Sequence, residues 1–524
     1  MFCVACGQKM QKILGLILTF DFCSCIINLS QQRSIAMKKY ISILMIVALC
    51  FCTCAVLFAG CTPPEPPAPP LPQGPETHDP DKEIADYDVY DGSVELKLAI
   101  GGYEWGPAVD GLVVKVDGKT FVEDFSKDTF RVTSQQANGK TLEVLEAYPC
   151  TEQGVKTDKA SNYFCVKFKT YAGVLSPFVY ANSVNRWSTG SVNFSLTLNE
   201  GQFLCMEDDV EILRFAKFEV SQKLSYSERV VPSTALLNKG SYSADGHTLT
   251  YGAYETEEMA TDKGENALII WLHGAGEGGT DVDIALIGND VTNLMEEQVQ
   301  KYFVTDDLAG AYVLAVQTPT MWMDNGTGNY TSDGTSTYTQ ALMETIEYYV
   351  EQNGDVDLDR IYIGGCSNGG YMTMNMLIHY GDYFAAGYPV CEAYADSWID
   401  ETELSALADA NIWFTHSKND GTVNPNTHTN ATYIRLLQAG ANVHYSMFED
   451  IRGIDDPTAA QAWGTTGNYN GHFSWIYTLS DRCTKVQSHE VTAINQLVAN
   501  NDGGGQEQVD DYASLWAWIA DQSR

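Results

Sequence analysis

Basic residues are scarce in this chain of 524 residues. Lys and Arg together number 31 against 68 Asp and Glu, which gives a formal net charge of −37 at pH 7. An exterior of this sign repels phosphate groups, so we expect neither nucleic acid nor an anionic membrane surface as a partner. The charge balance describes the surface of the protein and leaves its fold open.

Cysteine is sparse beyond the first 61 residues. Of the fourteen cysteines, eight lie at or before Cys61, and the others are Cys150, Cys165, Cys205, Cys366, Cys391 and Cys483. Six cysteines in the rest of the chain are too few for a disulfide scaffold. Cys150 and Cys165 either pair with each other or remain as two buried thiols, and the sequence leaves both alternatives open.

Residues 1–60 have the composition of a targeting region. Met37 begins a short basic stretch, an apolar run follows from Ile41 to Phe58, and small residues precede Cys61, which is the pattern of a secretory signal. We expect Met37 to be the true start. The ending resembles a bacterial lipobox with Phe58 in place of the usual Leu, which implies lipidation of Cys61. A transmembrane anchor or a plain signal peptide is the alternative.

A proline-rich stretch follows the signal. Residues 62–76 contain eight prolines, and such a run favours an extended, semi-rigid spacer. A spacer of this kind suits a tether that holds a folded domain away from a membrane. We therefore assign residues 61–86 to a lipidated cysteine and its linker.

Residues 87–228 alternate apolar and polar side chains in short runs. Val94, Leu96, Leu98 and Ile100 are one example, and turn signals such as Asn138-Gly139 separate the runs. Several short strands of this kind predict an all-β sandwich. The segment lacks a catalytic constellation, so we expect it to have a packing or positioning role.

Residues 229–524 alternate strand and helix patterns, which predicts an α/β fold with a doubly wound, mostly parallel sheet. The run from Ala267 to Leu272 is continuously apolar, as in a strand covered on both faces. We expect further strands at 249–254, 311–316, 360–364, 385–390, 411–415 and 443–448. We expect helices at 291–303, 339–353, 367–380, 402–408, 427–439 and near 515–519. The polar, Gly-rich insertion at 484–511 is interpreted as a mobile loop.

A pentapeptide with a central serine lies between a predicted strand and a predicted helix. Gly365–Gly369 fits G-x-S-x-G, and this context predicts a sharp turn that exposes Ser367 as a nucleophile. Side chains at Gly365 and Gly369 would collide with the neighbouring backbone, and the helix N-terminus favours negative charge beside the serine. An ordinary Gly-rich turn is the alternative.

An acid and a base should follow this serine in that order along the chain. Asp420 lies just past the end of a predicted strand, where it would orient a histidine. The alternative is that Asp420 is an ordinary residue of an Asp-Gly turn. His472 and His489 are the candidate bases, because both follow Asp420 outside regular elements. We choose His472 and interpret His416 as structural.

The loop after the first long apolar strand, Leu272–Gly279, is made of small residues. It offers the backbone N–H of Ala275 as one oxyanion donor, and the N–H of Asn368 would be the second. A phosphate loop is disfavoured because neither a Walker lysine nor the G-x-G-x-x-G spacing is present. Trp322 and Trp475 are candidates for lining the pocket, or else are core aromatics.

With these motifs in order, residues 250–524 resemble the α/β-hydrolase family. More narrowly, they are similar to secreted bacterial esterases related to polyhydroxybutyrate depolymerase, feruloyl esterase and the prolyl oligopeptidase group. The stretches that carry the resemblance are 272–277, 357–371, 384–391 and 472–475. The block Gly102–Val109 resembles the start of an immunoglobulin-like domain found ahead of certain bacterial esterases. Asn368 departs from the family, in which many relatives carry Met.

The resemblance implies a serine carboxylesterase at the bacterial cell surface, with Ser367, His472 and Asp420 as its triad. It requires no metal and no organic cofactor, and it contacts the membrane only through a lipid anchor. Acetylated or feruloylated polysaccharide, polyester and small-molecule esters all remain open as substrates, as does the oligomeric state. A prolyl-oligopeptidase-type peptidase and a non-catalytic surface-binding protein are the alternative functions.

Overall fold

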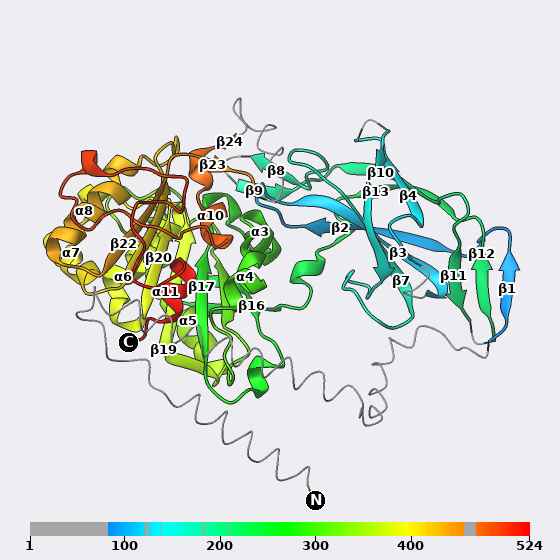
Figure 1. Ribbon diagram of the computed structural model, residues 1–524, viewed down its shortest axis with the longest axis horizontal. Helices are drawn as coiled ribbons and strands as arrows, with labels where there is room; N and C mark the ends of the chain where they lie inside the picture. Colours follow the sequence, from blue (N-terminus) through cyan, green and yellow to red (C-terminus); the bar gives the residue numbers. More distant parts are fainter. Residues whose placement is uncertain (1–81, 121–124, 138, 182–183, 209, 455–467) are drawn as a thin grey trace, which may run out of the picture. The chain divides into compact units, whose positions relative to one another are not determined.

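The computed structural model describes residues 82–120, 125–137, 139–181, 184–208, 210–454 and 468–524. The predicted signal region, Cys61 and most of the proline-rich linker therefore lie outside the described residues. The described residues belong to one compact unit, Pro75–Arg524. Within this unit an all-β part precedes an α/β part along the chain (Figure 1).

The all-β part consists of two sheets around one apolar core. The larger sheet has the path β1-β12-β11-β3-β2-β14, with β7 paired to β3 and β6 paired to β7, and the smaller sheet has the order β13-β10-β4-β5. Phe164 and Val114 of the larger sheet and Phe194 and Leu196 of the smaller sheet are buried in the same cluster. The alternating pattern thus does form a β-sandwich, and an immunoglobulin-like topology stays a prediction.

The strands of this part have the following bounds: β1 Ile84–Tyr87, β2 Val94–Gly101, β3 Ala108–Thr120, β4 Phe130–Ser134, β5 Thr141–Leu142, β6 Val144–Pro149, β7 Ser161–Phe168, β8 Phe178–Ala181, β9 Val184–Trp187, β10 Ser191–Leu198, β11 Leu204–Glu207, β12 Ile212–Phe215, β13 Glu219–Ser225 and β14 Arg229–Val230. Strands β8 and β9 form a separate two-stranded sheet.

The α/β part is built on one sheet of eight strands in the order β15-β16-β18-β17-β19-β20-β21-β22. The strands are β15 Asn238–Ala244, β16 His247–Tyr254, β17 Asn266–Leu272, β18 Tyr312–Gln317, β19 Val356–Cys366, β20 Ala386–Val390, β21 Ile412–Ser417 and β22 Val443–Phe448. The six strands from β18 to β22 in this order run parallel, whereas β16 is antiparallel to β18 and β15 to β16. This is the predicted mostly parallel sheet.

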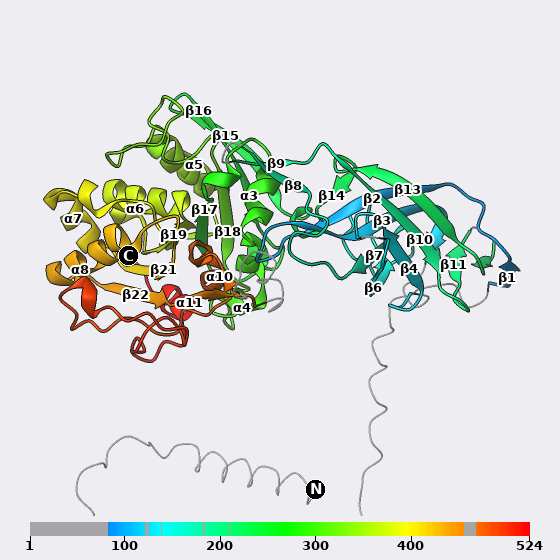
Figure 2. The same cartoon turned by 90° about the horizontal axis from the view of Figure 1, so that it is seen from above.

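Helices cover both faces of this sheet (Figure 2). They are α3 Val282–Gly288, α4 Glu297–Gln300, α5 Thr339–Gln352, α6 Asn368–Tyr380, α7 Glu401–Ala408, α8 Thr429–Ala439, α10 Trp475–Leu479 and α11 Leu515–Ala520. Along β17, Leu268 and Ile270 join the core beneath α5, α6 and α8, whereas Ile269 and Trp271 join the core beneath α3 and α11. Burial on both faces explains why this strand is apolar throughout.

The structure adds elements that the sequence did not predict. Strand β15 and helix α3 were both missed. The predicted helix at 291–303 divides into the short 3-10 helix η5 (Val291–Met295) and α4, because Glu296 between them is extended. None of the helices in the described part of the chain combines the length and the apolar character needed to cross a bilayer.

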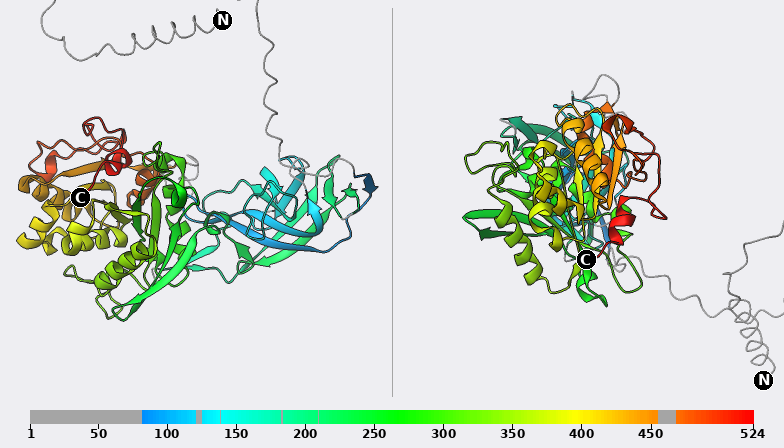
Figure 3. Two further views of the ribbon diagram at one scale, coloured as in Figure 1. Left: turned by 90° about the horizontal axis from the view of Figure 1, so that it is seen from below. Right: turned by 90° about the vertical axis from the view of Figure 1, so that its left-hand side faces the viewer.

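The insertion at 484–511 packs along the outer edge of β22, which corrects its interpretation as a mobile loop. Gln487 N–H donates to the Tyr445 carbonyl at 2.9 Å, and Met447 N–H donates to the Gly504 carbonyl at 2.6 Å. The insertion therefore satisfies backbone groups that would otherwise lie unpaired at a sheet edge. Figure 3 shows this segment, in red, beside the orange strands of that edge.

Cys150, Cys165, Cys366, Cys391 and Cys483 are free thiols. Cys150 and Cys165 lie buried in the sandwich as two thiols, which is the second of the two alternatives that the sequence left open.

Candidate active site

Ser367 occupies a strained turn between β19 and α6. Its backbone angles are φ 56° and ψ −112°, a combination that costs a non-glycine residue energy and is concentrated at functional sites. A Cβ atom at Gly365 would lie 2.4 Å from the Leu272 carbonyl oxygen, and one at Gly369 would lie 1.9 Å from it. The collisions expected from the sequence are therefore present, and Ser367 itself stays partly exposed.

Asp420 and His472 are brought together from loops that follow two neighbouring parallel strands. Asp420 follows β21, and His472 lies in the 3-10 helix η9 (Gly471–Phe473), beyond β22. His472 Nδ1 donates to Asp420 Oδ2 at 2.7 Å. Asp420 Oδ1 accepts the backbone N–H groups of Thr422 at 2.7 Å and Val423 at 2.9 Å. The carboxylate is thus fixed on both oxygens.

Electrostatics favour a charged acid beside a basic imidazole. Burial raises the pKa of Asp420, but hydrogen bonds from His416 and His472 outweigh burial and hold it well below the ordinary value. Burial lowers the pKa of His472, but Cys391 and the Asp420 carboxylate raise it by more, so the pKa of His472 lies above the ordinary value. We assign that increase to Asp420, whose carboxylate accepts the hydrogen bond from His472 Nδ1.

Cys391 is a neighbour of this pair that the sequence did not single out. It directly follows β20 with φ 37°, and its Sγ atom lies with ligand atoms of Asp420 and His472 in a group whose members are within 4.8 Å of one another. Thiolate, imidazole and carboxylate are all metal ligands. Here the hydrogen bond between Asp420 and His472 already explains the approach of those two side chains.

Both predicted oxyanion donors are the first residues of helices. Ala275 begins the 3-10 helix η4 (Ala275–Glu277), and Asn368 begins α6. The first N–H groups of a helix have no acceptor within the helix, so they remain available to an anion. The side chain of Asn368 accepts the backbone N–H of Trp322 at 2.6 Å, which ties the serine turn to the loop after β18.

The two tryptophans proposed for the pocket have structural surroundings. Trp322 is fully buried, and its Nε1 donates to the His273 carbonyl at 3.1 Å, so it supports the oxyanion loop from the core. Trp475 is buried with its ring edge-on to that of His472, and the ring centroids are 5.9 Å apart. Trp322 is therefore a core aromatic, and Trp475 packs against His472.

The separate two-stranded sheet of β8 and β9 contributes two hydrogen bonds to the oxyanion loop. Asn185 Nδ2 of β9 donates to Glu277 Oε1 of η4 at 2.8 Å, and Arg186 Nη1 donates to the Gly278 carbonyl at 3.0 Å. Burial raises the pKa of Glu277 to about 7, against the lowering effect of Asn185. Sequence reasoning gave no sign of this contact, because 92 residues separate Asn185 from Glu277.

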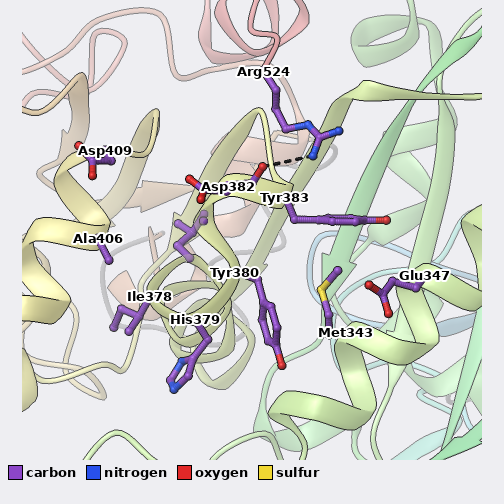
Figure 4. Close-up of a pocket in the computed structure, with 12 residues that line it drawn as sticks. Met343, Glu347, Ile378, His379, Tyr380, Asp382, Tyr383, Ala406, Asp409 and Arg524 are labelled. Atoms are coloured by element: carbon purple, nitrogen blue, oxygen red, sulfur yellow. Dashed lines mark hydrogen bonds between the residues drawn. The ribbon is translucent and has the colours of Figure 1, made fainter.

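The alternative base, His489, lies at a different place. Its Nε2 is 3.2 Å from Nδ1 of His444, and both residues line a cavity of about 560 Å³ with Glu507 and Trp518. A second cavity of about 510 Å³ lies between α5 and the C-terminal end of α6, where Arg524 donates to the Asp382 carbonyl at 3.2 Å (Figure 4). Neither cavity is lined by Ser367, Asp420 or His472.

Comparison with known proteins gives a family model and a fold. The model of the prolyl oligopeptidase family matches residues 320–443, which include Ser367 and Asp420. A solved thermostable esterase is similar over 82% of this chain and 99% of its own, with 19% identity and a TM-score of 0.58. No curated protein sequence matches the chain.

Two further solved structures resemble smaller parts of the chain. Acylaminoacyl peptidase of Pyrococcus horikoshii has 17% identity and a TM-score of 0.29 over 50% of each chain. The poly(3-hydroxybutyrate) depolymerase LpqC of Bordetella parapertussis has 12% identity and a TM-score of 0.30 over 40% of this chain and 82% of its own. The fold is that of an α/β-hydrolase, and the family match with the serine turn indicates a serine hydrolase.

Proposed function

We propose that this protein is a serine carboxylesterase with Ser367, His472 and Asp420 as its catalytic triad. The observation that carries the proposal is the 2.7 Å hydrogen bond from His472 Nδ1 to Asp420 Oδ2. The two residues follow strands of the same parallel sheet as the Ser367 turn, so all three lie at the carboxyl end of that sheet.

The mechanism follows from the positions of these groups. Ser367 Oγ attacks the ester carbonyl while His472 takes its proton, and His472 then gives that proton to the leaving alcohol, which leaves the acyl group on Ser367. Water then attacks the acyl-enzyme with His472 as base, which releases the carboxylic acid and restores Ser367. Asp420 holds the imidazole in the Nδ1–H tautomer and stabilises the imidazolium. The N–H groups of Ala275 and Asn368 receive the oxyanion, each worth about 3 to 4 kcal/mol by analogy with other oxyanion holes.

A short-chain p-nitrophenyl ester tests the reaction class directly. We expect turnover by the purified mature protein and its loss in Ser367→Ala. A protein that folds and turns over no ester in a panel of acetyl, feruloyl and hydroxyalkanoate esters would refute the esterase proposal. Such a panel would also separate polysaccharide, polyester and small-molecule substrates.

A peptidase is the second candidate, because the family model that matches residues 320–443 is that of prolyl oligopeptidases. The esterase is favoured because the domain ahead of the hydrolase sheet is a two-sheet sandwich, whereas this peptidase group usually carries a propeller. Comparing kcat/KM for an N-acyl peptide amide and for the matching ester decides between the two. A higher value for the amide would favour the peptidase.

We also propose that the protein is exported and held at the cell surface by lipid on Cys61. The sequence of the signal region and the proline-rich spacer supports this proposal.

A further inference from the structure

Asp420 Oδ2 is shared between two imidazoles. His472 Nδ1 lies 2.7 Å from this oxygen, and Nε2 of His416 lies 3.0 Å from it. His416 belongs to β21, is fully buried, and takes no part in the mechanism above. A carboxylate oxygen has two lone pairs, so both N–H groups can donate to it at once.

Behind His416 the contacts continue through a buried hydroxyl to a buried carboxyl group. His416 Nδ1 lies 2.9 Å from Oγ1 of Thr429, the first residue of α8, and that hydroxyl lies 2.9 Å from Glu392 Oε1. The N–H of Tyr394 donates to Glu392 Oε2 at 2.7 Å. Thr429 and Glu392 are fully buried, and no Lys or Arg within the described ranges pairs with Glu392.

Each contact in this series needs one proton, which fixes the direction of all of them. The ionised Asp420 only accepts, so His416 must carry its proton on Nε2. A neutral His416 then presents a lone pair on Nδ1, and Thr429 must donate to it. The Thr429 oxygen can then accept a hydrogen bond from Glu392 only if the Glu392 carboxyl group is protonated. An ionised Glu392 would instead claim the Thr429 proton and require His416 to be an imidazolium.

Burial disfavours that charged pair. It lowers the pKa of His416, although Asp420 and the Val423 carbonyl favour protonation, and His472 opposes it. Burial also raises the pKa of Glu392 well above its usual range, and the nearby Asp396 adds to the increase. His428 and Tyr445 are further titratable groups beside this series. Burial lowers the pKa of His428 and raises that of Tyr445, so both favour their neutral forms. The proton therefore stays on Glu392.

We propose that Glu392, Thr429 and His416 form a positioning chain for the triad acid. A directed run of hydrogen bonds from the Glu392 carboxyl through the Thr429 hydroxyl and the His416 ring holds Asp420 in line with His472. This proposal rests on the triad assigned above. His416 and Glu392 act through Asp420 and are positioning residues.

The chain has a measurable effect on the base. The N–H of His416 draws part of the negative charge of Asp420 Oδ2 away from His472. Without it, Asp420 would stabilise the His472 imidazolium more strongly, so the pKa of His472 would increase. The rising limb of kcat/KM against pH would then move to higher pH, and the less constrained carboxylate would lower kcat.

Paired substitutions test the two ends of the chain with a p-nitrophenyl ester. His416→Phe keeps the bulk and loses the donor, so kcat should fall by about tenfold to a hundredfold, as for one hydrogen bond to a charged group, with little change in KM and an alkaline shift of the pH profile. His416→Gln restores an N–H donor and should recover most of the wild-type kcat and of the wild-type pH profile. Glu392→Gln keeps a donor toward Thr429 and should resemble wild type, whereas Glu392→Ala should resemble His416→Phe.

Several results would contradict the proposal of a positioning chain. An unchanged pH profile in His416→Phe would leave His416 a packing role alone, and a Glu392→Gln variant as impaired as Glu392→Ala would mean that Glu392 is ionised. Because these variants can fail to fold, ¹⁵N NMR of the wild-type histidines provides an independent measurement. It should show His416 as the neutral Nε2–H tautomer at neutral pH, and an imidazolium or an Nδ1–H tautomer would refute the proposal. This measurement remains informative even if no ester is hydrolysed, so failure of the proposed function is distinguishable.

Discussion

The pKa of His472 decides the pH range in which Ser367 can be activated, because only a neutral imidazole accepts the serine proton. An unperturbed histidine titrates near pH ~6.5, and the structure indicates a higher value beside Asp420. We therefore predict that kcat/KM falls as pH decreases, with a midpoint above that of a free histidine. A pH profile of kcat/KM on the wild-type protein measures this midpoint.

Asp420→Asn separates the charge of the acid from its position. The variant should lose about 10⁴-fold in kcat, because the histidine no longer has its orienting acceptor. The remaining activity should titrate at lower pH than in wild type, since the charge that raises the pKa of His472 has been removed. A variant with an unchanged midpoint would show that Asp420 does not set this pKa.

At the residue scale, local motifs in the sequence indicate candidate reactive groups, whereas the groups that support them depend on tertiary contacts. Ser367, Asp420 and His472 follow from chain order and from their positions after predicted strands. The sequence left His416 with a structural role and gave Cys391 and Glu392 none, because the importance of these residues depends on contacts between the segments around β20, β21 and α8. Those contacts join residues as far as 37 positions apart, and local patterns carry no record of them.

Among the elements, the turn between β19 and α6 depends on close backbone packing. A Cβ atom at Gly369 would meet the Leu272 carbonyl oxygen at 1.9 Å, and backbone cannot move aside as a flexible side chain can. We predict that Gly369→Ala lowers the free energy of unfolding by about 1 to 3 kcal/mol or more, as overpacking does elsewhere. Chemical denaturation compares it with Gly354→Ala, where a Cβ would meet open space. Equal stability of the two variants would contradict the packing argument.

The contact between β9 and η4 makes a prediction about pH and stability. Burial raises the pKa of Glu277 in the folded protein to about 7, above its ordinary value of 4.5, so its contribution to stability decreases as pH rises between these values. Asn185→Ala removes the N–H donor that stabilises the ionised Glu277 carboxylate. The variant should therefore lose more unfolding free energy above pH 7 than below it, by about 1 to 3 kcal/mol for an unpaired buried group.

Thermal unfolding at pH 5 and pH 8 measures this difference. The control is Asn193→Ala, which removes an exposed hydrogen bond to Gln135 within the sandwich. The control should lower Tm equally at both pH values, and the same behaviour in Asn185→Ala would exclude the coupling to Glu277.

Secondary structure was predictable where burial imposes a pattern. Strand β17 is buried at every residue, and α6 follows a strand and a Gly-flanked turn. By contrast, β15 has mostly exposed and half-exposed residues, so its sequence carries no continuous apolar signal. Helix α3 is short, and the contact of Ile287 with the sandwich core depends on tertiary packing.

For the whole molecule, the proposed anchor is the feature that decides where the enzyme acts. A lipoprotein carries several acyl chains and stays on the membrane, whereas one chain gives only marginal binding. We predict that Cys61→Ser releases the protein into the medium or blocks its maturation, as cell fractionation would show. Intact-mass analysis of the wild-type protein is the matching measurement, and a mature N-terminus elsewhere without lipid would contradict the anchor.

The central claim is that Ser367 is the nucleophile and His472 its base. The most direct measurement is labelling of the mature protein with a fluorophosphonate, followed by peptide mapping, in wild type and in the two histidine variants. The label should attach to Ser367 in wild type and in His489→Ala, and only slowly in His472→Ala, while Ser367→Ala should lose about 10⁴-fold or more of the activity. A label on another serine, or an active His472→Ala beside an inactive His489→Ala, would contradict the account.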